Sequence, residues 1–485
     1  MRPRGRDNVE RLARSGRMFR SAPRRLWPVT SPIGLVVLTL STFAAHAAAP
    51  IPVGRCEGSL TWLPADALPD GTPPAARQLA TWLRPGGDAE LLDPEAIAFL
   101  NQRNSDVIGA WRDPLADAAP AMEAVDAELV ERLAQITTRV SLGELVPGPR
   151  LDSAAFPPSG AFDEVRPRIE NAWPVDVVQA VVEPIDLKCV PFSYGLYRGR
   201  IDRWFDRNQC SRLAPGDMLR VLRRTDDGWL YVRAGHGVGW LEDAALSPPM
   251  TPDAARALRD RPRLTIVDDL VPARTARGEL VFLRLGTGLP LVSDAAGGDY
   301  QVLVPRPEGW VDAFVERGPG VREGFLPLTR DNVLRLAFAR LGDAYGWGGL
   351  GGFRDCSGLL LDVAATFDLR LGRNSSVQAL AGAQTIDVSA LSEADKVLAI
   401  RAAGERGVVF LYMPGHLMLY LGALDGRDYA LSAISEYLLP CPEGGHRTVR
   451  IDRVDVTDLE RGRGTERTAF LQRIQTLALF SSGAP

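Results

Sequence analysis

The chain has 485 residues, of which 46% are hydrophobic and 24% are charged, an ordinary composition for a soluble globular protein of about three domains. Its formal net charge of −4 is close to neutral for this length and therefore indicates neither a nucleic-acid partner nor an anionic membrane. No spacing of cysteine and histidine residues resembles a zinc site, so we expect no metal and no cofactor.

The N-terminal segment 1–49 has the pattern of an export signal peptide. Arginine-rich residues up to Arg25 precede the apolar run 33–45, and the small residues at 45–47 fit a cleavage site of the A-x-A kind. The run is too short and too rich in small residues for a stable membrane span, with an uncleaved anchor as the alternative. Translation could also begin at Met18. We expect a periplasmic or secreted protein with no stable membrane span after cleavage.

Residues 50–184 are rich in alanine, proline and acidic residues and contain apolar positions at helical spacing. The clearest helical patterns are Asp93–Arg103 and Ala121–Ile136. We expect a mostly helical supporting domain here.

In residues 185–249 the pattern changes to short β-like runs separated by turns. The clearest runs are 218–222, 229–232 and 237–241. Short strands at this spacing indicate a small barrel. The segments DDGWLYV and GVGWL resemble bacterial SH3-like domains, which often bind the cell wall.

A fainter copy of this order follows in residues 250–325. Its runs are 288–292, 300–304 and 308–311. We interpret this part as a second, divergent SH3-like domain, and an unrelated β-hairpin region is the alternative.

Cys356 follows a glycine-rich loop and lies at the start of a predicted helix. Leu359, Leu360, Val363 and Phe367 then recur at helical spacing. The unpaired amides and positive dipole end of a helix start stabilise a thiolate, so this position predicts a lowered cysteine pKa. A small buried core cysteine is the alternative.

A cysteine nucleophile needs a general base, and the chain has only four histidines. His416 begins the β-like run 416–421, directly after a Met-Pro-Gly turn. In an extended strand it shares one face with Met418 and Tyr420. A histidine at such a strand start points into a cleft more often than into a core. A structural histidine with satisfied hydrogen bonds is the alternative.

The segments YGWGG, RDCSGLLLD, GRNSSVQA and YMPGHLMLYLG, in this order, resemble the NlpC-type cell-wall cysteine peptidases. The resemblance covers residues 326–485 and implies a papain-like fold. It also implies that Cys356 is the nucleophile, that His416 is the base, and that Tyr345 lines the site near the oxyanion.

The same resemblance assigns a substrate-binding role to the two residues that flank the cysteine. In similar enzymes the positions of Asp355 and Ser357 hold the free amine of an N-terminal L-Ala. Each residue also fits a simpler role as a cap of the predicted helix. Tyr345 likewise fits an aromatic core.

The chain departs from the family pattern at two positions. Arg354 stands where the family usually has phenylalanine. The third catalytic position, usually a second histidine, aligns best with Ser432, and Glu436 and His446 are the alternatives. A serine hydroxyl can orient His416, but it cannot hold an imidazolium as a charged or ring partner does.

Export permits disulfides, and the four cysteines other than Cys356 allow two bridges. Cys189 with Cys210 is the most local pairing. The spacing alone does not decide the connectivity.

Together these observations predict an α+β protein: a C-terminal papain-like peptidase domain preceded by two small all-β SH3-like barrels and a mostly helical N-terminal domain. The resemblance implies an exported peptidoglycan hydrolase that cleaves the γ-D-glutamyl–diamino-acid bond of cell-wall stem peptides. The alternatives are an amidase or acyltransferase on the same Cys-His fold, and a cell-wall-binding protein whose catalytic site has decayed.

Overall fold

Helices and strands both contribute to the computed structural model of this chain, which describes residues 56–118, 120–242, 245–294 and 298–482. This mixed content agrees with the expected α+β class. The expected signal peptide, 1–49, lies outside the described residues. Within them, no helix combines the length and the apolar character needed to cross a membrane.

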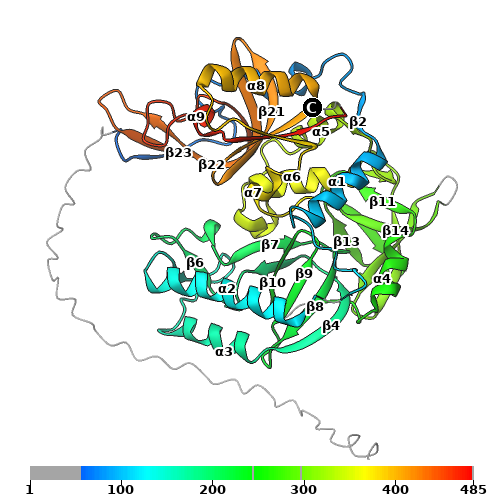
Figure 1. Cartoon of the computed structure of the whole chain (residues 1–485). Coiled ribbons are helices and arrows are strands. Elements are labelled where there is room, and N and C mark those ends of the chain that lie inside the picture. The colour runs from blue at the N-terminus through cyan, green and yellow to red at the C-terminus, as the bar shows by residue number, and fades with distance from the viewer. Residues whose placement is uncertain (1–55, 119, 243–244, 295–297, 483–485) are drawn as a thin grey trace, which may run out of the picture. The chain divides into compact units, whose positions relative to one another are not determined.

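The C-terminal part of the chain is built on a seven-stranded sheet (Figure 1). All its neighbouring strands are antiparallel except β1, which runs parallel to β23. In spatial order the strands are β1 (Leu60–Trp62), β23 (His446–Asp458), β22 (Arg427–Pro440), β21 (His416–Leu424), β20 (Val408–Met413), β24 (Thr476–Phe480) and β19 (Gln384–Asp387).

Strand β21 sends alternate side chains to opposite faces of this sheet, as its sequence pattern predicts. Its buried leucines join the core that contains α5 (Arg330–Phe338) and α6 (Cys356–Ala365). Met418 and Tyr420 join the other core, against α8 (Glu393–Arg406). Figure 1 accordingly shows α6 and α8 on opposite faces of the sheet. Two short helices complete this part, α7 (Ser375–Gln378) and α9 (Phe470–Arg473).

A six-stranded antiparallel sheet occupies the first region where short strands are expected. The strands that match the sequence runs begin within one residue of the expected positions. In spatial order the sheet contains β4 (Trp173–Ala180), β8 (Met218–Arg224), β9 (Leu230–Ala234), β10 (Gly237–Leu241), β5 (Ile185–Lys188) and β7 (Gln209–Leu213).

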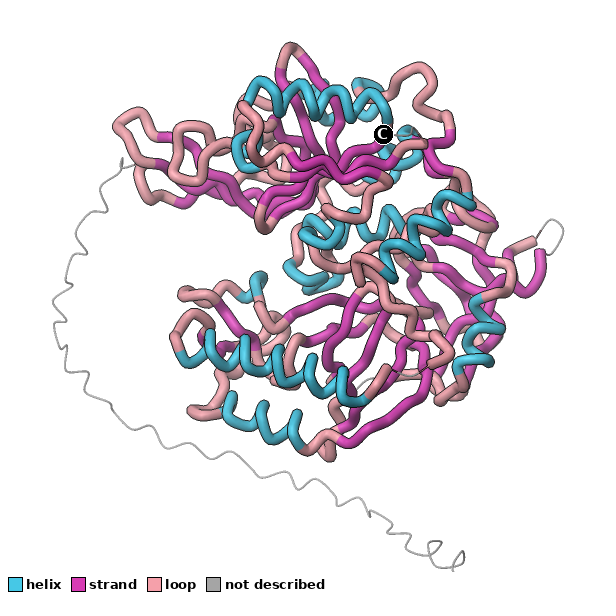
Figure 2. The backbone as a smooth tube through the Cα atoms, viewed as in Figure 1, coloured by secondary structure: helices cyan, strands magenta, loops and turns pink. Residues whose placement is uncertain are grey.

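The fainter copy forms a seven-stranded antiparallel sheet with a core of its own (Figure 2). The helix α4 (Pro252–Arg259) precedes this sheet. Its strands, in spatial order, are β13 (Leu280–Leu283), β12 (Val271–Thr275), β16 (Gly309–Val315), β15 (Tyr300–Arg306), β14 (Gly288–Asp294), β11 (Arg263–Ile266) and β17 (Val321–Glu323).

The described part of segment 50–184 differs from the separate helical domain expected there. Its two long helices, α1 (Pro94–Asp106) and α2 (Met122–Ser141), agree with the helical patterns. However, the apolar face of α1 packs into the core that contains α6, and the apolar face of α2 packs against the six-stranded sheet. Amphipathic helices bury their apolar stripe against the nearest apolar surface, which here belongs to other parts of the chain.

The same segment also supplies strands. Besides β1 and β4, it contributes one strand to each of two small antiparallel pairs. These pairs are β2 (Glu90–Leu92) with β18 (Leu328–Thr329), and β3 (Val146–Gly148) with β6 (Gly195–Tyr197). The short helix α3 (Val165–Glu170) completes the segment.

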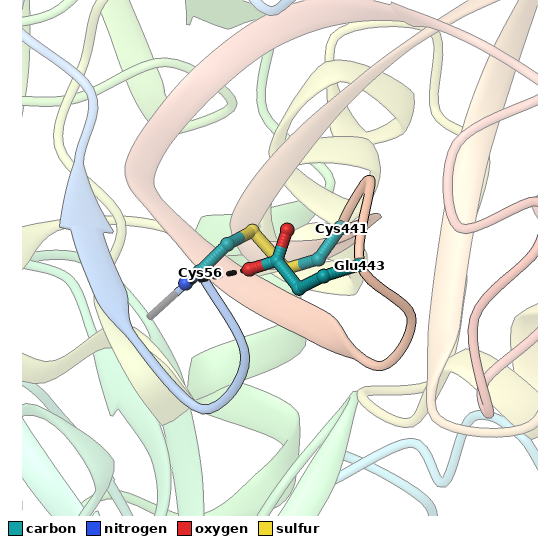
Figure 3. Close-up of side chains that lie close together, drawn as sticks. All are labelled: Cys56, Cys441 and Glu443. Atoms are coloured by element: carbon teal, nitrogen blue, oxygen red, sulfur yellow. Dashed lines mark hydrogen bonds between the residues drawn. A yellow bond between two sulfur atoms is a disulfide. The ribbon is translucent and has the colours of Figure 1, made fainter. Parts of the chain in front are cut away.

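Of the two disulfides, one is local in the sequence and the other joins residues 385 positions apart. Cys189 pairs with Cys210, the most local of the pairings that the sequence allows. Cys56 pairs with Cys441, and the Cys56 backbone N–H donates to Glu443 at 3.1 Å (Figure 3). Because the two sulfurs are bonded to each other, this cluster offers no thiolate to a metal. Cys356 is left as a free, buried thiol.

A buried ion-pair network joins the seven-stranded sheet of residues 263–323 to the start of α6. Arg354 is only 5% exposed, and it donates to Asp269 at 2.6 and 2.7 Å and to Asp362 at 2.7 Å. Arg340 also contacts Asp269. Burial alone would raise the pKa of Asp269, but Arg354 and Arg340 outweigh it and hold this pKa well below its usual range. The network gives a physical reason for an arginine at this position.

We expect Arg354→Leu to lower the free energy of unfolding at pH 7 by about 3 kcal/mol, because it removes one partner from a buried set of charges. The folded-state pKa of Asp269 is depressed, so its contribution is present above the unfolded pKa and is lost as the pH falls through the folded one. The gap between wild type and variant should therefore shrink in strong acid.

Urea unfolding at several pH values measures both effects. Arg277→Leu is the control, because Arg277 makes only an exposed ion pair with Glu308. A loss in Arg354→Leu no larger than in this control would contradict the importance of the network.

Candidate active site

The loop before Cys356 packs directly on strand β7, and only glycine fits at its closest approach. Gly348 has a φ of +63°, and a Cβ at this position would lie 2.5 Å from the backbone oxygen of Gln209. Gly349 has a φ of +85° and would place a Cβ 2.7 Å from Arg212. Glycine tolerates both the positive φ and the close backbone contact.

Asp355 holds this loop to the first turn of α6. Its carboxylate accepts hydrogen bonds from the backbone N–H groups of Gly358 and Gly348, each at 2.8 Å. Arg373 donates to both carboxylate oxygens, at 3.0 and 2.7 Å. Burial alone would raise the pKa of Asp355, but Arg373 and the two N–H groups lower it. The carboxylate is thus saturated by donors from the protein itself.

Ser357 belongs to the same cluster. Its hydroxyl accepts a hydrogen bond from Arg373 at 2.9 Å and lies 3.3 Å from the carboxylate of Asp355. The structure therefore brings the two residues expected to bind a substrate amine together around one guanidinium. Sequence reasoning did not single out Arg373, although it lies in the GRNSSVQA segment that carries the family resemblance.

Cys356 is the first residue of α6 and is 8% exposed. Its sulfur accepts a hydrogen bond from the backbone N–H of Leu417, which places the thiol beside the start of β21. Burial raises the pKa of Cys356 to about 12, and the charge of Asp355 adds to this effect. The lowered pKa expected from the helix start is therefore wrong for the resting site, because desolvation outweighs the helix dipole.

His416 is the first residue of β21, and its Nε2 lies 3.1 Å from the hydroxyl of Ser432 on β22. Burial lowers the pKa of His416 to about 4, and the charge of Arg473 lowers it further. The imidazole is therefore neutral at pH 7. When Nε2–H donates to Ser432, Nδ1 carries the lone pair that can accept a proton.

The other two residues considered for the third position have different partners. Glu436 forms ion pairs with Arg467 at 2.9 Å and with Arg450 at 3.7 Å. His446 contacts Glu466 at 3.3 Å. Of the three residues, Ser432 is the one that the structure places on the ring of His416.

A cavity of about 360 Å³ opens beside these residues. Tyr345 and His416 both line it. Tyr345 is buried and stacks on Phe205 with ring centroids 5.5 Å apart. Burial raises the pKa of Tyr345 well above its usual value, so the phenol keeps its proton and can donate a hydrogen bond.

The wall of the cavity is strongly basic. Its carboxylates are those of Asp202 and Glu436, whereas six arginines contribute to the lining. The arginines are Arg198, Arg200, Arg207, Arg450, Arg467 and Arg473. The low net charge of the whole chain gives no sign of this local excess, because the arginines come from separate segments. Such a cavity favours an anionic ligand.

Comparison with known proteins identifies the region that contains Cys356 and His416. The NlpC/P60 family model matches residues 342–430, which include Cys356 and His416. No curated protein matches the chain. The match identifies an NlpC-type peptidase domain in the C-terminal part of the chain.

Two solved structures extend the comparison. A structure described as a novel NlpC/P60 endopeptidase from Photobacterium damselae subsp. piscicida has a TM-score of 0.65 and 17% identity, over 83% of this chain and 96% of that one. An NlpC/P60 family protein from Bacillus cereus ATCC 10987 has a TM-score of 0.43 and 15% identity, over 63% of this chain and 99% of that one. The first likeness shows that the fold is shared over most of the chain.

The resting protonation states lead to a test of thiol reactivity. Because burial raises the pKa of Cys356 to about 12, its alkylation by iodoacetamide should be slow in mild acid. The rate should rise about tenfold per pH unit from pH 7 to pH 9, in proportion to the thiolate. Mass spectrometry of the modified protein gives the rate, with a small free thiol as the reference. A rate that is already maximal at pH 5 would show a preformed thiolate–imidazolium pair and contradict this assignment.

Proposed function

We propose that the protein is an exported cysteine peptidase that cleaves the γ-D-glutamyl–diamino-acid bond of peptidoglycan stem peptides. The observation that carries the proposal is the free thiol of Cys356 at a helix start, next to the backbone of Leu417, which follows His416 on β21, within the region matched by the NlpC/P60 model. The resemblance supplies the choice of bond, and the basic cavity supports an acidic peptide as substrate.

In this mechanism the proton moves as the nucleophile attacks, because the resting thiol and imidazole are both neutral. His416 takes the proton of Cys356, and the sulfur bonds to the γ-carbonyl carbon of D-glutamate. The C–N bond breaks to leave a thioester, and His416 returns the proton to the leaving amine. Water, activated by His416, then hydrolyses the thioester and frees the thiol.

The developing oxyanion needs hydrogen-bond donors that are already in place. The backbone N–H groups at the start of α6 supply them, together with the protonated hydroxyl of Tyr345 on the cavity wall. Ser432 orients the imidazole of His416 through Nε2.

The contacts of Asp355 and Ser357 support a positioning role. The resemblance assigns these residues to the free amine of an N-terminal L-Ala. Arg373 and two backbone N–H groups already occupy the carboxylate of Asp355, so an ammonium group would have to displace a guanidinium. We therefore assign Asp355 to the alignment of the glycine-rich loop with α6.

The alternatives make different predictions for the same site. An amidase or acyltransferase would pass the thioester to another acceptor and would differ in its product. A decayed cell-wall-binding protein would fit the loss of a second catalytic histidine. The contact of Ser432 with His416 argues against decay, because the imidazole still has a hydrogen-bond partner.

The β sheets and the disulfides support the remaining parts of the proposal. The two antiparallel sheets consist of short strands, each sheet with apolar core residues of its own, which supports small wall-binding β domains of the SH3-like kind. The bridges Cys56–Cys441 and Cys189–Cys210 are typical of an oxidising compartment such as the periplasm.

The first functional prediction concerns the two reacting residues. Cys356→Ala should abolish cleavage of L-Ala-γ-D-Glu-diamino-acid peptides without changing the melting temperature by more than a few degrees, because the side chain is small. His416→Ala should be nearly as severe. Product analysis by chromatography measures cleavage. Parental rates in purified Cys356→Ala protein would disprove the mechanism.

The second functional prediction concerns Ser432. Ser432→Ala should lower kcat by about tenfold, since an orienting hydrogen bond is worth on the order of 1 kcal/mol. His446→Ala is the matched control, because His446 contacts Glu466 and not His416. An unchanged rate in Ser432→Ala, with a large loss in His446→Ala or Glu436→Ala, would reassign the third position.

A further inference from the structure

Two arginines of the cavity, Arg207 and Arg473, are partly buried and have no carboxylate partner among the described residues. Arg450 and Arg467 are paired with carboxylates, and Arg198 and Arg200 are exposed to solvent. Arg207 and Arg473 both line the cavity, and neither forms an ion pair or a side-chain hydrogen bond with any residue that the structure describes. In each case Nε is buried without a hydrogen-bond partner. A partly buried guanidinium with an unpartnered Nε and no carboxylate is costly, so such a group is a candidate for binding an anion.

Arg207 lies on the side of the cavity formed by the glycine-rich loop. Its guanidinium carbon lies 3.7 Å from the ring centre of Trp347, and this stacking fixes the plane of the guanidinium group. Burial lowers the pKa of Arg207 to about 10, and the charge of Arg198 contributes. The nearby carboxylate of Asp202 is engaged by Arg450 at 2.8 Å.

Arg473 lies on the side of the cavity formed by His416. Its guanidinium carbon is 5.1 Å from the ring centre of Phe470, whose ring centre lies 6.1 Å from that of His416. Burial lowers the pKa of Arg473, and the charge of Arg467 adds to the effect. Its own charge in turn acts on His416.

The paired arginines of the same cavity provide an internal contrast. Arg450 contacts Asp202, Asp452 and Glu436, and Arg467 contacts Glu436. These pairs satisfy the two carboxylates of the wall from within the protein. The uncompensated positive charge therefore includes that of Arg207, which stacks on Trp347, and that of Arg473, which lies on Phe470 near His416.

We propose that Arg207 and Arg473 form two carboxylate-binding subsites that select substrates with a free carboxylate on each side of the scissile bond. This inference rests on the proposed function. A γ-linked D-glutamyl residue keeps its α-carboxylate free on the acyl side, and the diamino acid carries another carboxylate on the leaving side. Planar guanidinium forks bind carboxylates in a bidentate manner.

The chemistry of the reaction assigns each arginine to one side. His416 protonates the leaving amine, so the leaving group lies next to His416 and Arg473. The oxyanion forms on the acyl side, near Tyr345, and Arg207 stacks on the neighbouring Trp347. Arg207 therefore binds the α-carboxylate of D-glutamate, and Arg473 binds the carboxylate of the diamino acid.

Three tripeptides test this assignment: L-Ala-γ-D-Glu-diamino acid, the same peptide with the α-carboxamide of D-glutamate, and the same peptide with the α-carboxamide of the diamino acid. For the wild type, kcat/KM should fall about tenfold or more for each amide, because a charge-assisted hydrogen bond is lost. Arg207→Gln should lose discrimination against the first amide only. Arg473→Gln should lose discrimination against the second amide only.

Binding to Cys356→Ala protein, measured by calorimetry, should show the same pattern in Kd, which separates substrate selection from effects on His416. Arg207→Lys and Arg473→Lys keep the charge and should retain part of the discrimination, and melting temperatures establish that each variant is folded. Arg277→Gln changes an exposed arginine between β12 and β13, and this control variant should behave as wild type.

The outcomes separate the two levels of the argument. Wild-type protein that cleaves none of the three peptides would overturn the proposed function. Wild-type protein that cleaves all three at equal rates would leave the proposed function in place and overturn the carboxylate subsites. Discrimination that persists unchanged in both glutamine variants would overturn the assignment to Arg207 and Arg473.

Discussion

The ion pair between Asp355 and Arg373 is the contact on which the arrangement of the site depends. Asp355 caps α6, binds the N–H of Gly348 and pairs with Arg373. Arg373 also donates through Nε to Ser211 on strand β7, at 3.1 Å. One buried charge pair thus joins helix α6, the glycine-rich loop and the six-stranded sheet. Loss of either partner would leave an uncompensated buried charge where these three elements meet.

Desolvation sets the chemical character of the site. Burial keeps the thiol of Cys356 and the imidazole of His416 neutral at rest, against the tendency of the helix start to stabilise a thiolate. Neutral Cys356 and His416 near a cavity with unpaired arginines are consistent with the anionic substrate that we propose.

A similar charged contact connects the seven-stranded sheet of residues 263–323 to the start of α6. Arg354, two positions before Cys356, is held between Asp269 of that sheet region and Asp362 of α6. An aromatic residue at this position could pack but could not connect two acidic groups. The departure from the family pattern at Arg354 is therefore matched by acidic partners elsewhere in the chain.

Local sequence patterns predicted the helix that begins at Cys356 and the alternation of His416, Met418 and Tyr420 along β21. They also predicted three strands in each of the two smaller β regions, but not the other strands of those sheets. The predicted features depend on periodicity and turn residues that neighbours in the sequence already specify. Tertiary structure decided the rest. Burial and contacts between residues far apart in the chain determined the partners of Asp355, the raised pKa of the Cys356 thiol and the packing of segment 50–184. They also left Arg207 and Arg473 without a carboxylate partner. No local sequence pattern encodes these features.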